Sequence, residues 1–342
     1  MYERLPPAIL RVPFKQYLCA LLLATSFSAT AYPRTDRMDL FPKLQAGQTV
    51  TYQISYRTDK KVSAHSSLAL ADDPAGANIQ VRALLRLEVL GVELQASRAI
   101  IHARTQFQSL DSDLKLKMPG LEPPPNQTQP QDPKETYIEF TIFPDGRVDQ
   151  VKGLDALFPE RQQAWQEWVS RFAAAAVFPH DGIRLSQKWR SEEPERTPSP
   201  IAGLAWMRES IYVRNEPCHT PQITVQGGVA YSAQSPDTCA VIFTVATLKQ
   251  SSSPKDATPD DFRVRQLRTL GMARGKNTTI LYISLKTGLL VRASNAADQA
   301  MSVTVAKADG SNRVHYDVNA TSHTDISLVT DTPLARTDFV HP

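Results

Sequence analysis

The sequence predicts a mainly β protein, a β-rich α+β fold in which one large curved antiparallel sheet carries a single major amphipathic helix. Three observations predict it: strands that alternate apolar and polar residues, glycine-containing turns between them, and one helical repeat of about five turns. Antiparallel strands joined by such turns are typical of a half-barrel, a sandwich or a strongly curved sheet. We expect a single β-rich domain over residues 47–330.

The clearest early strand covers residues 49–58, TVTYQISYRT, where apolar and polar side chains alternate strictly. Such alternation places the apolar side chains on one face of a strand. That face comprises Val50, Tyr52, Ile54 and Tyr56. Residues 79–107 indicate two further long strands that meet near Leu90-Gly91. The proline-rich residues 119–134 are predicted to form a loop, because proline lacks the amide donor that a sheet needs.

A helix is predicted for residues 159–177. Pro159 suits the first helical turn, and Glu160 suits the positive end of the helix dipole. Apolar residues then recur at the spacing of one helix face. This stripe comprises Trp165, Trp168, Val169, Phe172, Ala173 and Ala176. The opposite side carries Glu160, Gln163, Glu167, Ser170, Arg171 and Ala174.

The second half of the chain is predicted to consist of strands. Residues 191–200, SEEPERTPSP, indicate an exposed turn, and residues 256–261 indicate a polar turn. From residue 277 onward the alternation is plainest, with turns at 286–288 and 309–310. The first turn follows NTTILYISL, the stretches LLVRASNA and AMSVTVAKA come next, and the second turn leads into RVHYDVNATSHTDISLV. This order predicts an antiparallel meander.

Residues 1–31 have the pattern of a secretory signal peptide, with basic residues, a short apolar run and a small-residue ATA motif at the end. The apolar run is shorter than the about 20 residues that a membrane-spanning helix needs. We therefore predict a secreted or periplasmic protein with no transmembrane segment after cleavage of the signal. An N-terminal extension is expected over residues 32–46 and a flexible tail over residues 331–342.

Cys218 and Cys239 are predicted to form a disulfide, because an even pair of cysteines in an oxidising compartment is typically bridged. The residues between them indicate a hairpin around Gly227-Gly228, so the bridge is expected to join the strand ends at the open side of that hairpin. A redox pair, or a metal site that adds His219, is the alternative. Both alternatives lack the close C-x-x-C spacing.

Four stretches carry a resemblance: GQTVTYQISY, FTIFPDGRVDQVKGLDALFPE, FPHDGIRLSQKW and LGMARGKNTTILYISLKTGLLVRA. In them the chain resembles uncharacterised secreted bacterial proteins that are grouped as a domain of unknown function. The resemblance covers Leu44 to Val329. It implies a curved antiparallel sheet with one amphipathic helix, and it implies no catalytic residue. In shape alone, the expected fold is similar to the exported half-barrel folds of lipoprotein and lipid carriers.

The sequence contains no recognisable catalytic motif. It lacks the G-x-S-x-G of α/β-hydrolases, a zinc-binding histidine pair and a phosphate-binding loop. We therefore predict no catalytic residue, no metal site and no cofactor. His180-Asp181 is read as a loop after the helix, and His315 and Asp317 as part of a solvated strand face. A formal net charge of +3 gives no electrostatic signature of a nucleic-acid partner.

Trp165, Trp168 and Phe172 are the candidate ligand-binding residues. A helix that lies on a curved sheet can leave a cavity, and these side chains would line it. Alternatively they form an ordinary core, since each aromatic side chain offers about 150–250 Å² for burial. A helix on a membrane surface is less favoured, because the basic residues of its polar face are balanced by acidic ones.

These observations leave two main functions. The first is a non-enzymatic envelope or extracellular binding protein, whose partner is an apolar, lipid-like small molecule or an envelope component. The second is a secreted hydrolase whose acid and base residues come from separated loops. A plain interaction module, which uses an exposed sheet edge, is a further alternative.

Overall fold

The computed structural model describes residues 37–66, 75–95, 98–117, 137–144, 146–173, 178–179, 181–195, 199–221 and 232–329. The chain divides into two units, Met1–Asp36 and Arg37–Pro342, and all described residues belong to the second. Several predicted features lie outside the described residues: the signal peptide, the proline-rich loop, the C-terminal tail, the turn at Gly227-Gly228, His180, and residues 174–177 of the helix.

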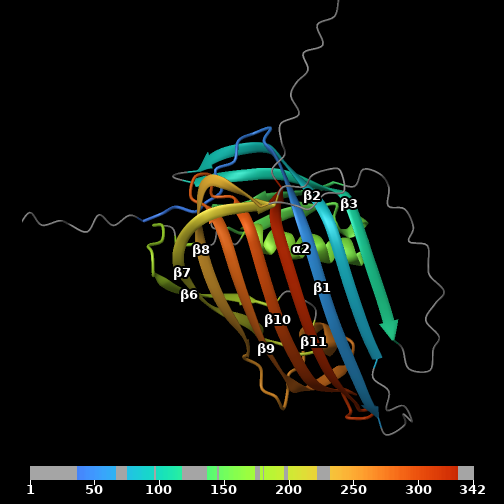
Figure 1. Ribbon diagram of the computed structural model, residues 1–342. Coiled ribbons are helices and arrows are strands. Elements are labelled where there is room, and N and C mark those ends of the chain that lie inside the picture. Colours follow the sequence, from blue (N-terminus) through green and yellow to red (C-terminus); the bar gives the residue numbers. More distant parts are fainter. Residues whose placement is uncertain are drawn as a thin grey trace, which may run out of the picture. The chain divides into compact units, whose positions relative to one another are not determined.

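The mainly β fold with one major helix is confirmed (Figure 1). The first five strands are β1 (Thr49–Ser66), β2 (Ala75–Gln95), β3 (Arg98–Lys117), β4 (Ile138–Ile142) and β5 (Val148–Lys152). A short 3-10 helix, η1 (Leu154–Ala156), and the helix α2 (Pro159–Phe172) follow. The remaining elements are β6 (Lys188–Pro194), β7 (Leu204–Pro221), β8 (Ser232–Gln250), α3 (Asp260–Val264), β9 (Leu267–Ser284), β10 (Leu290–Lys307) and β11 (Val314–Val329).

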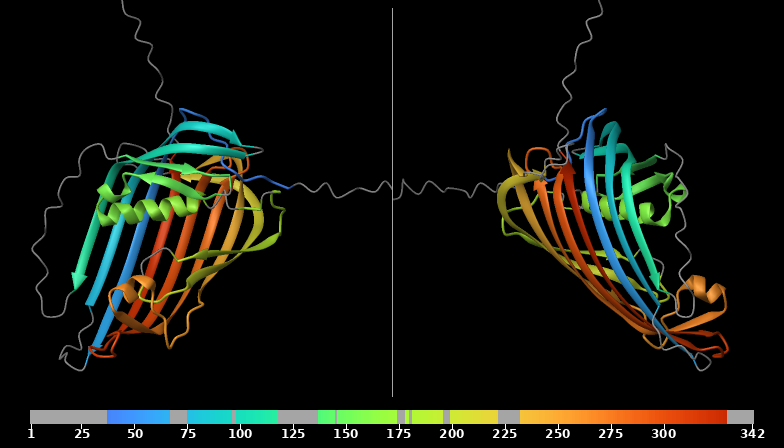
Figure 2. Two further views of the ribbon diagram at one scale, coloured as in Figure 1. Left: turned by 180° about the vertical axis from the view of Figure 1, so that it is seen from behind. Right: turned by 45° about the vertical axis from the view of Figure 1, so that its right-hand side comes forward.

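All eleven strands form one antiparallel sheet in the order β5-β4-β3-β2-β1-β11-β10-β9-β8-β7-β6. Except for β5 and β6, strands that follow one another in the chain are neighbours, and the first and last strands pair in the middle of the sheet. Consequently β5 and β6, although consecutive in the chain, are the two opposite edges. The connection between these two edges includes α2, which lies on the concave face of the sheet (Figure 2).

The main hydrophobic core lies between this concave face and α2. The face predicted for the first strand is confirmed, because Tyr52, Ile54 and Tyr56 are all buried there. Buried side chains of β2, β3 and β4 continue the core toward one edge. Leu40 and Phe41, which precede β1, are buried in the same core, so part of the predicted N-terminal extension packs against the sheet.

The boundary between β2 and β3 differs from the predicted one. β2 continues through Leu90-Gly91 to Gln95, and only a shift in register marks the place where two strands were predicted to meet. Such a bulge inserts an extra residue into a strand without ending it. Leu90 is 45% exposed, and Gly91 lies beside the ring of His102. The Leu-Gly pair therefore marks a bend in a strand, which residue types alone do not distinguish from a turn.

The polar turn predicted at residues 256–261 also differs, because its last residues begin the helix α3. Pro259 directly precedes this helix, and Asp260 and Asp261 occupy its first turn. Acidic residues at that end interact favourably with the helix dipole. Five residues are too few for a periodic apolar stripe, so the sequence pattern did not reveal the helix.

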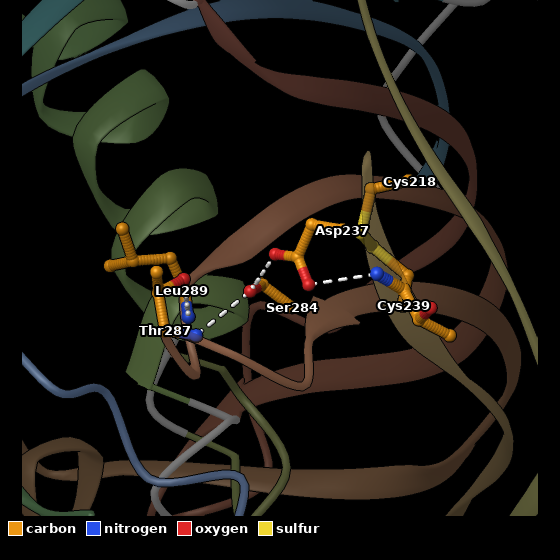
Figure 3. Close-up of a disulfide and its surroundings, with 7 residues drawn as sticks. Cys218, Asp237, Cys239, Ser284, Thr287 and Leu289 are labelled. Carbon is orange, nitrogen blue, oxygen red and sulfur yellow. Dashed lines mark hydrogen bonds between the residues drawn. A yellow bond between two sulfur atoms is a disulfide. The ribbon is translucent and has the colours of Figure 1, made fainter. Parts of the chain in front are cut away.

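The predicted disulfide between Cys218 and Cys239 is present and joins β7 to β8. Its position differs from the expected one. The two strands stay paired beyond the bridge as far as Leu204 and Gln250, so the disulfide lies within the ladder and not at the open end of the hairpin. Asp237, beside the bridge, accepts a hydrogen bond from the Ser284 hydroxyl and so connects this region to β9 (Figure 3).

Candidate functional site

The apolar side of α2 is packed into the main core. The Trp168 and Phe172 rings stack with centroids 4.8 Å apart, and both side chains are fully buried. Phe140 of β4 packs edge-on against Trp165, with centroids 5.5 Å apart. Trp165 Nε1 donates a hydrogen bond of 2.8 Å to Thr105 Oγ1. The three candidate ligand-binding residues thus join helix to sheet, and a ligand contact for them remains a prediction.

The polar side of α2 faces a different part of the concave surface. Glu167 forms an ion pair of 2.6 Å with Arg171, one helical turn away. The same carboxylate accepts a hydrogen bond of 3.1 Å from Thr324 Oγ1 of β11. Gln163 Nε2 donates to the Tyr56 hydroxyl at 3.0 Å. The helix is therefore bonded to the sheet on its polar side as well as packed on its apolar side.

A row of polar side chains crosses the sheet below α2. The strand register places each member directly opposite the next, from β7 through β8, β9 and β10 to β11. The row comprises Ser210, Thr244, Thr279, Asn295 and Thr324. We call it the polar row. A parallel row of apolar side chains lies two residues away from the polar row on each strand and belongs to the main core. It comprises Tyr212, Ile242, Leu281, Ala293 and Ile326.

Two pairs within the polar row are hydrogen-bonded. Ser210 Oγ and Thr244 Oγ1 are 2.8 Å apart, and Asn295 Nδ2 donates to Thr279 Oγ1 at 2.7 Å and also to Asn277 Oδ1. Asn295 is only 2% exposed. Burial of a polar group is costly unless it is hydrogen-bonded. Apolar side chains could fill these positions equally well if packing were their only role. The hydrogen-bonded polar groups therefore indicate a surface that makes polar contacts.

Four members of the polar row, all except Thr324, form one wall of a cavity of about 240 Å³, which we call the polar chamber. Its lining comes from α2, the segments on either side of β6, and strands β6 to β11. Along β10 the chamber spans Asn295 to Gln299, between Ala293 of the main core and Met301 beyond. Met301 packs on a second apolar cluster, which is made of Ile201, Ala257 and Val303. A hydrogen-bonding compartment thus lies between two apolar ones.

Trp206 of β7 gives the chamber an aromatic surface of defined orientation. Its Nε1 donates a hydrogen bond of 2.7 Å to Glu195 Oε2. Its ring lies so close to β9 that a Cβ atom at Gly275 would come within 2.9 Å of the ring carbon Cη2. Trp189 of β6 also lines the chamber, and its ring packs edge-on against Phe178 with centroids 5.5 Å apart.

The charged groups of the chamber are held in pairs or hydrogen bonds. Besides Glu167 and Arg171, Arg208 forms an ion pair of 2.5 Å with Glu193 of β6. Tyr56 lies opposite Thr324, where the polar row reaches β1. Burial raises the pKa of Tyr56 to about 12, the Thr58 hydroxyl opposes this shift by hydrogen bonding, and Glu167 adds to it. The Tyr56 hydroxyl therefore stays protonated at neutral pH.

This site was not predicted from the sequence. Glu193 and Glu195, assigned to an exposed turn, instead belong to β6 and the residue after it, and bond to Arg208 and Trp206. One feature of the sequence could have indicated it. In NTTILYISL, Asn277 and Thr279 alternate in step with Leu281, so their side chains lie on the same strand face as that buried leucine. His315 and Asp317, by contrast, lie 3.4 Å apart and about two-fifths exposed on the other face of the sheet, as predicted for a solvated strand face.

No protein-family model matches the sequence, and no curated protein matches it. A structure described as lipid–protein interactions in lipovitellin is weakly similar, with a TM-score of 0.36 and 9% identity; it covers 84% of this chain and 25% of the lipovitellin chain. This protein thus spans about a quarter of that chain's length. OccK7 (OpdD) of Pseudomonas aeruginosa has a TM-score of 0.18 and 7% identity, and covers 83% and 99% of the two chains. Neither likeness supports an assignment of function.

Proposed function

We propose that this chain is an exported, non-enzymatic binding protein that holds a lipid-like, amphipathic ligand between α2 and the concave face of the sheet. The polar row carries the proposal. It is aligned across five strands, its member Thr324 bonds to α2, and its other four members line a cavity that apolar clusters bound on both sides. Sites for small molecules are typically concave and combine apolar walls with a few placed polar groups.

The concave surface beside the chamber is apolar, which supports an amphipathic ligand. On β2, the positions opposite Tyr56 and Thr58 are Val81 and Ile79. Further across, Leu110 of β3 lies opposite Ala83 on the same face. Ile79 and Leu110 are only partly buried and pack against the main core. A ligand with its polar group in the chamber would find an apolar surface for its tail on β2 and β3.

The disulfide supports an exported protein, since such bridges persist mainly in oxidising compartments such as the periplasm and the extracellular medium. This agrees with the signal peptide that the sequence predicts. Among the described residues, no helix is both long and apolar enough to cross a membrane.

The acidic groups of the chamber favour binding over hydrolysis. Glu167 is bonded to Arg171 and Thr324, and Glu195 accepts from Trp206. A hydrolase needs a carboxyl group that is available to give or take a proton from the substrate. Both carboxylates instead hold the walls of the chamber in position.

The test is mass spectrometry of the native protein after export in its host, with and without organic extraction. We expect a bound small molecule in the wild type and a lower occupancy in Thr279→Val, which removes a hydroxyl from the chamber. The matched control is Thr278→Val, the same change at the neighbouring residue, whose side chain lies on the opposite face. A wild-type protein that carries no ligand and binds no added amphiphile would contradict the proposal.

A further inference from the structure

We propose that the polar chamber recognises an uncharged, hydroxylated ring, such as a monosaccharide or another cyclic polyol. This inference rests on the proposed function and names the chemical class of the polar group that the chamber takes. Three features of the lining carry it: the balance of its charges, the mixture of its hydrogen-bonding groups, and its fixed aromatic rings.

The charges of the lining favour an uncharged ligand. Two arginines and two glutamates line the chamber. Arg171 is paired with Glu167, and Arg208 is paired with Glu193. Glu195 accepts the hydrogen bond of the Trp206 indole. An anionic or cationic ligand group would have to break one of these arrangements to gain a partner, and a charge that is buried without a partner is strongly disfavoured.

The uncharged groups of the lining both donate and accept hydrogen bonds. Ser170, Ser191 and Ser322 contribute hydroxyl groups, and Gln299 contributes a carboxamide. Hydroxyl groups and carboxamides each combine donor and acceptor capacity. A ligand that also combines both capacities, on several atoms at once, matches such a lining. Sugar and polyol hydroxyls have this property, whereas a carbonyl, an ether or a phosphate has acceptors alone.

Two aromatic rings add flat apolar area to this lining, and of the two Trp206 is buried whereas Trp189 is half-buried. The Trp206 ring is held at one end by Glu195 and lies against the backbone at Gly275. Trp189 lines the same chamber. An indole presents an apolar face and a polar edge, and the C–H face of a pyranose ring stacks on such a surface. The cavity volume of about 240 Å³ is many times what a single water molecule needs, so the chamber has room for a single sugar ring.

The same ring chemistry has two sources, the head group of a glycolipid and a free saccharide. Titration calorimetry, together with tryptophan fluorescence, distinguishes them when four probes are compared below their micelle concentrations. The probes are octyl glucoside, octyl phosphate, octyltrimethylammonium and methyl glucoside. The three amphiphiles share one tail and differ in head-group charge, and methyl glucoside has the head group without the tail.

We expect octyl glucoside to bind at least about tenfold more tightly than both charged amphiphiles. Methyl glucoside that binds as tightly as octyl glucoside identifies a free saccharide as the source, which keeps this inference and contradicts the lipid-like ligand of the proposed function. Weaker binding of methyl glucoside identifies a lipid head group and agrees with both. If the charged amphiphiles bind equally well or better, this inference is overturned while the proposed function stands. If none of the four probes binds, both are overturned.

A pair of variants locates the binding. Gln299→Leu removes one hydrogen-bonding group from the chamber, and we expect it to weaken octyl glucoside binding by about three- to tenfold. The control is Gln80→Leu, the same change in β2. The Gln80 side chain is exposed on the face of the sheet that points away from the chamber, so this variant should leave the affinity unchanged. Equal affinities for both variants and the wild type would place the sugar outside the chamber and overturn the inference.

Discussion

Tyr52 of β1 and Trp168 of α2 pack with ring centroids 5.7 Å apart at the centre of the main core. Neither the Tyr52 hydroxyl nor Trp168 Nε1 has a hydrogen-bond partner among the residues that the structure describes. A buried polar atom without a partner costs about 1–3 kcal/mol. The burial of the two rings therefore stabilises the packing of α2 on the sheet. The unpartnered Tyr52 hydroxyl and Trp168 Nε1 reduce that stabilisation.

Tyr52→Phe is expected to leave the free energy of unfolding unchanged or to raise it by up to about 1 kcal/mol, because it removes an unpartnered hydroxyl. The measurement is urea-induced unfolding. Trp165→Phe is the comparison, because it removes a real hydrogen bond to Thr105 and should destabilise. If Tyr52→Phe instead lowers the free energy of unfolding by more than about 1 kcal/mol, the Tyr52 hydroxyl has a partner, such as an ordered water.

Trp168→Ala is expected to lower the free energy of unfolding by about 3–5 kcal/mol, as for other large aromatic residues in a core. Thermal and urea unfolding measure the change. The control is Leu94→Ala, at a residue that is 85% exposed, where about 0.5 kcal/mol or less is expected. Near-unchanged unfolding together with lost ligand binding would instead make Trp168 a wall of the ligand site.

Replacement of both cysteines, Cys218→Ala with Cys239→Ala, is expected to lower the free energy of unfolding by about 3 kcal/mol. The bridge closes a loop with a sequence separation of 21 residues, and opening that loop increases the freedom of the unfolded chain. Urea unfolding of the double variant and of the reduced wild type should give similar midpoints. A variant as stable as the oxidised wild type would show that the bridge adds nothing to folding.

Gly275→Ala is expected to destabilise by about 1–3 kcal/mol and to weaken ligand binding. The added Cβ would lie 2.9 Å from Trp206 Cη2, so the indole must move away from β9. Tryptophan fluorescence and unfolding together report both effects. Gly91→Ala is the control, since its Cβ would meet His102 at an ordinary 3.9 Å. Unchanged fluorescence in Gly275→Ala would indicate that Trp206 does not rest on this strand.

The free energy of unfolding is expected to fall at alkaline pH, and this fall should be smaller in Tyr56→Phe than in the wild type. Burial raises the pKa of Tyr56 to about 12, whereas an unfolded tyrosine titrates near 10. The contribution to stability is complete below about pH 10 and is lost as the pH rises toward 12, because only the unfolded chain releases its proton in that interval. Urea midpoints at about pH 8 and pH 11 measure the fall. An equal fall in wild type and Tyr56→Phe would contradict this assignment.

Local patterns in the sequence predicted much of the fold. Strict alternation identified the buried face of β1, and glycine turns identified the β9–β11 meander. The apolar spacing of Trp165, Trp168 and Phe172 identified the helix face that packs on the sheet. Each of these features depends on residues that are close in the chain, so its periodicity is visible in one stretch of sequence.

The polar chamber could not be predicted in this way. Asn295, Thr279 and Thr324 each occupy an ordinary strand position, and alternation alone does not say which side of a strand will be enclosed. That was decided by pairing β1 with β11, which left β5 and β6 at opposite edges and sent α2 across the concave face. The sequence by itself determined the strands, the helix and their apolar faces, because those follow from backbone periodicity. Only the tertiary structure brought distant polar residues into one row, because strand register is a relation between segments that lie far apart in the chain.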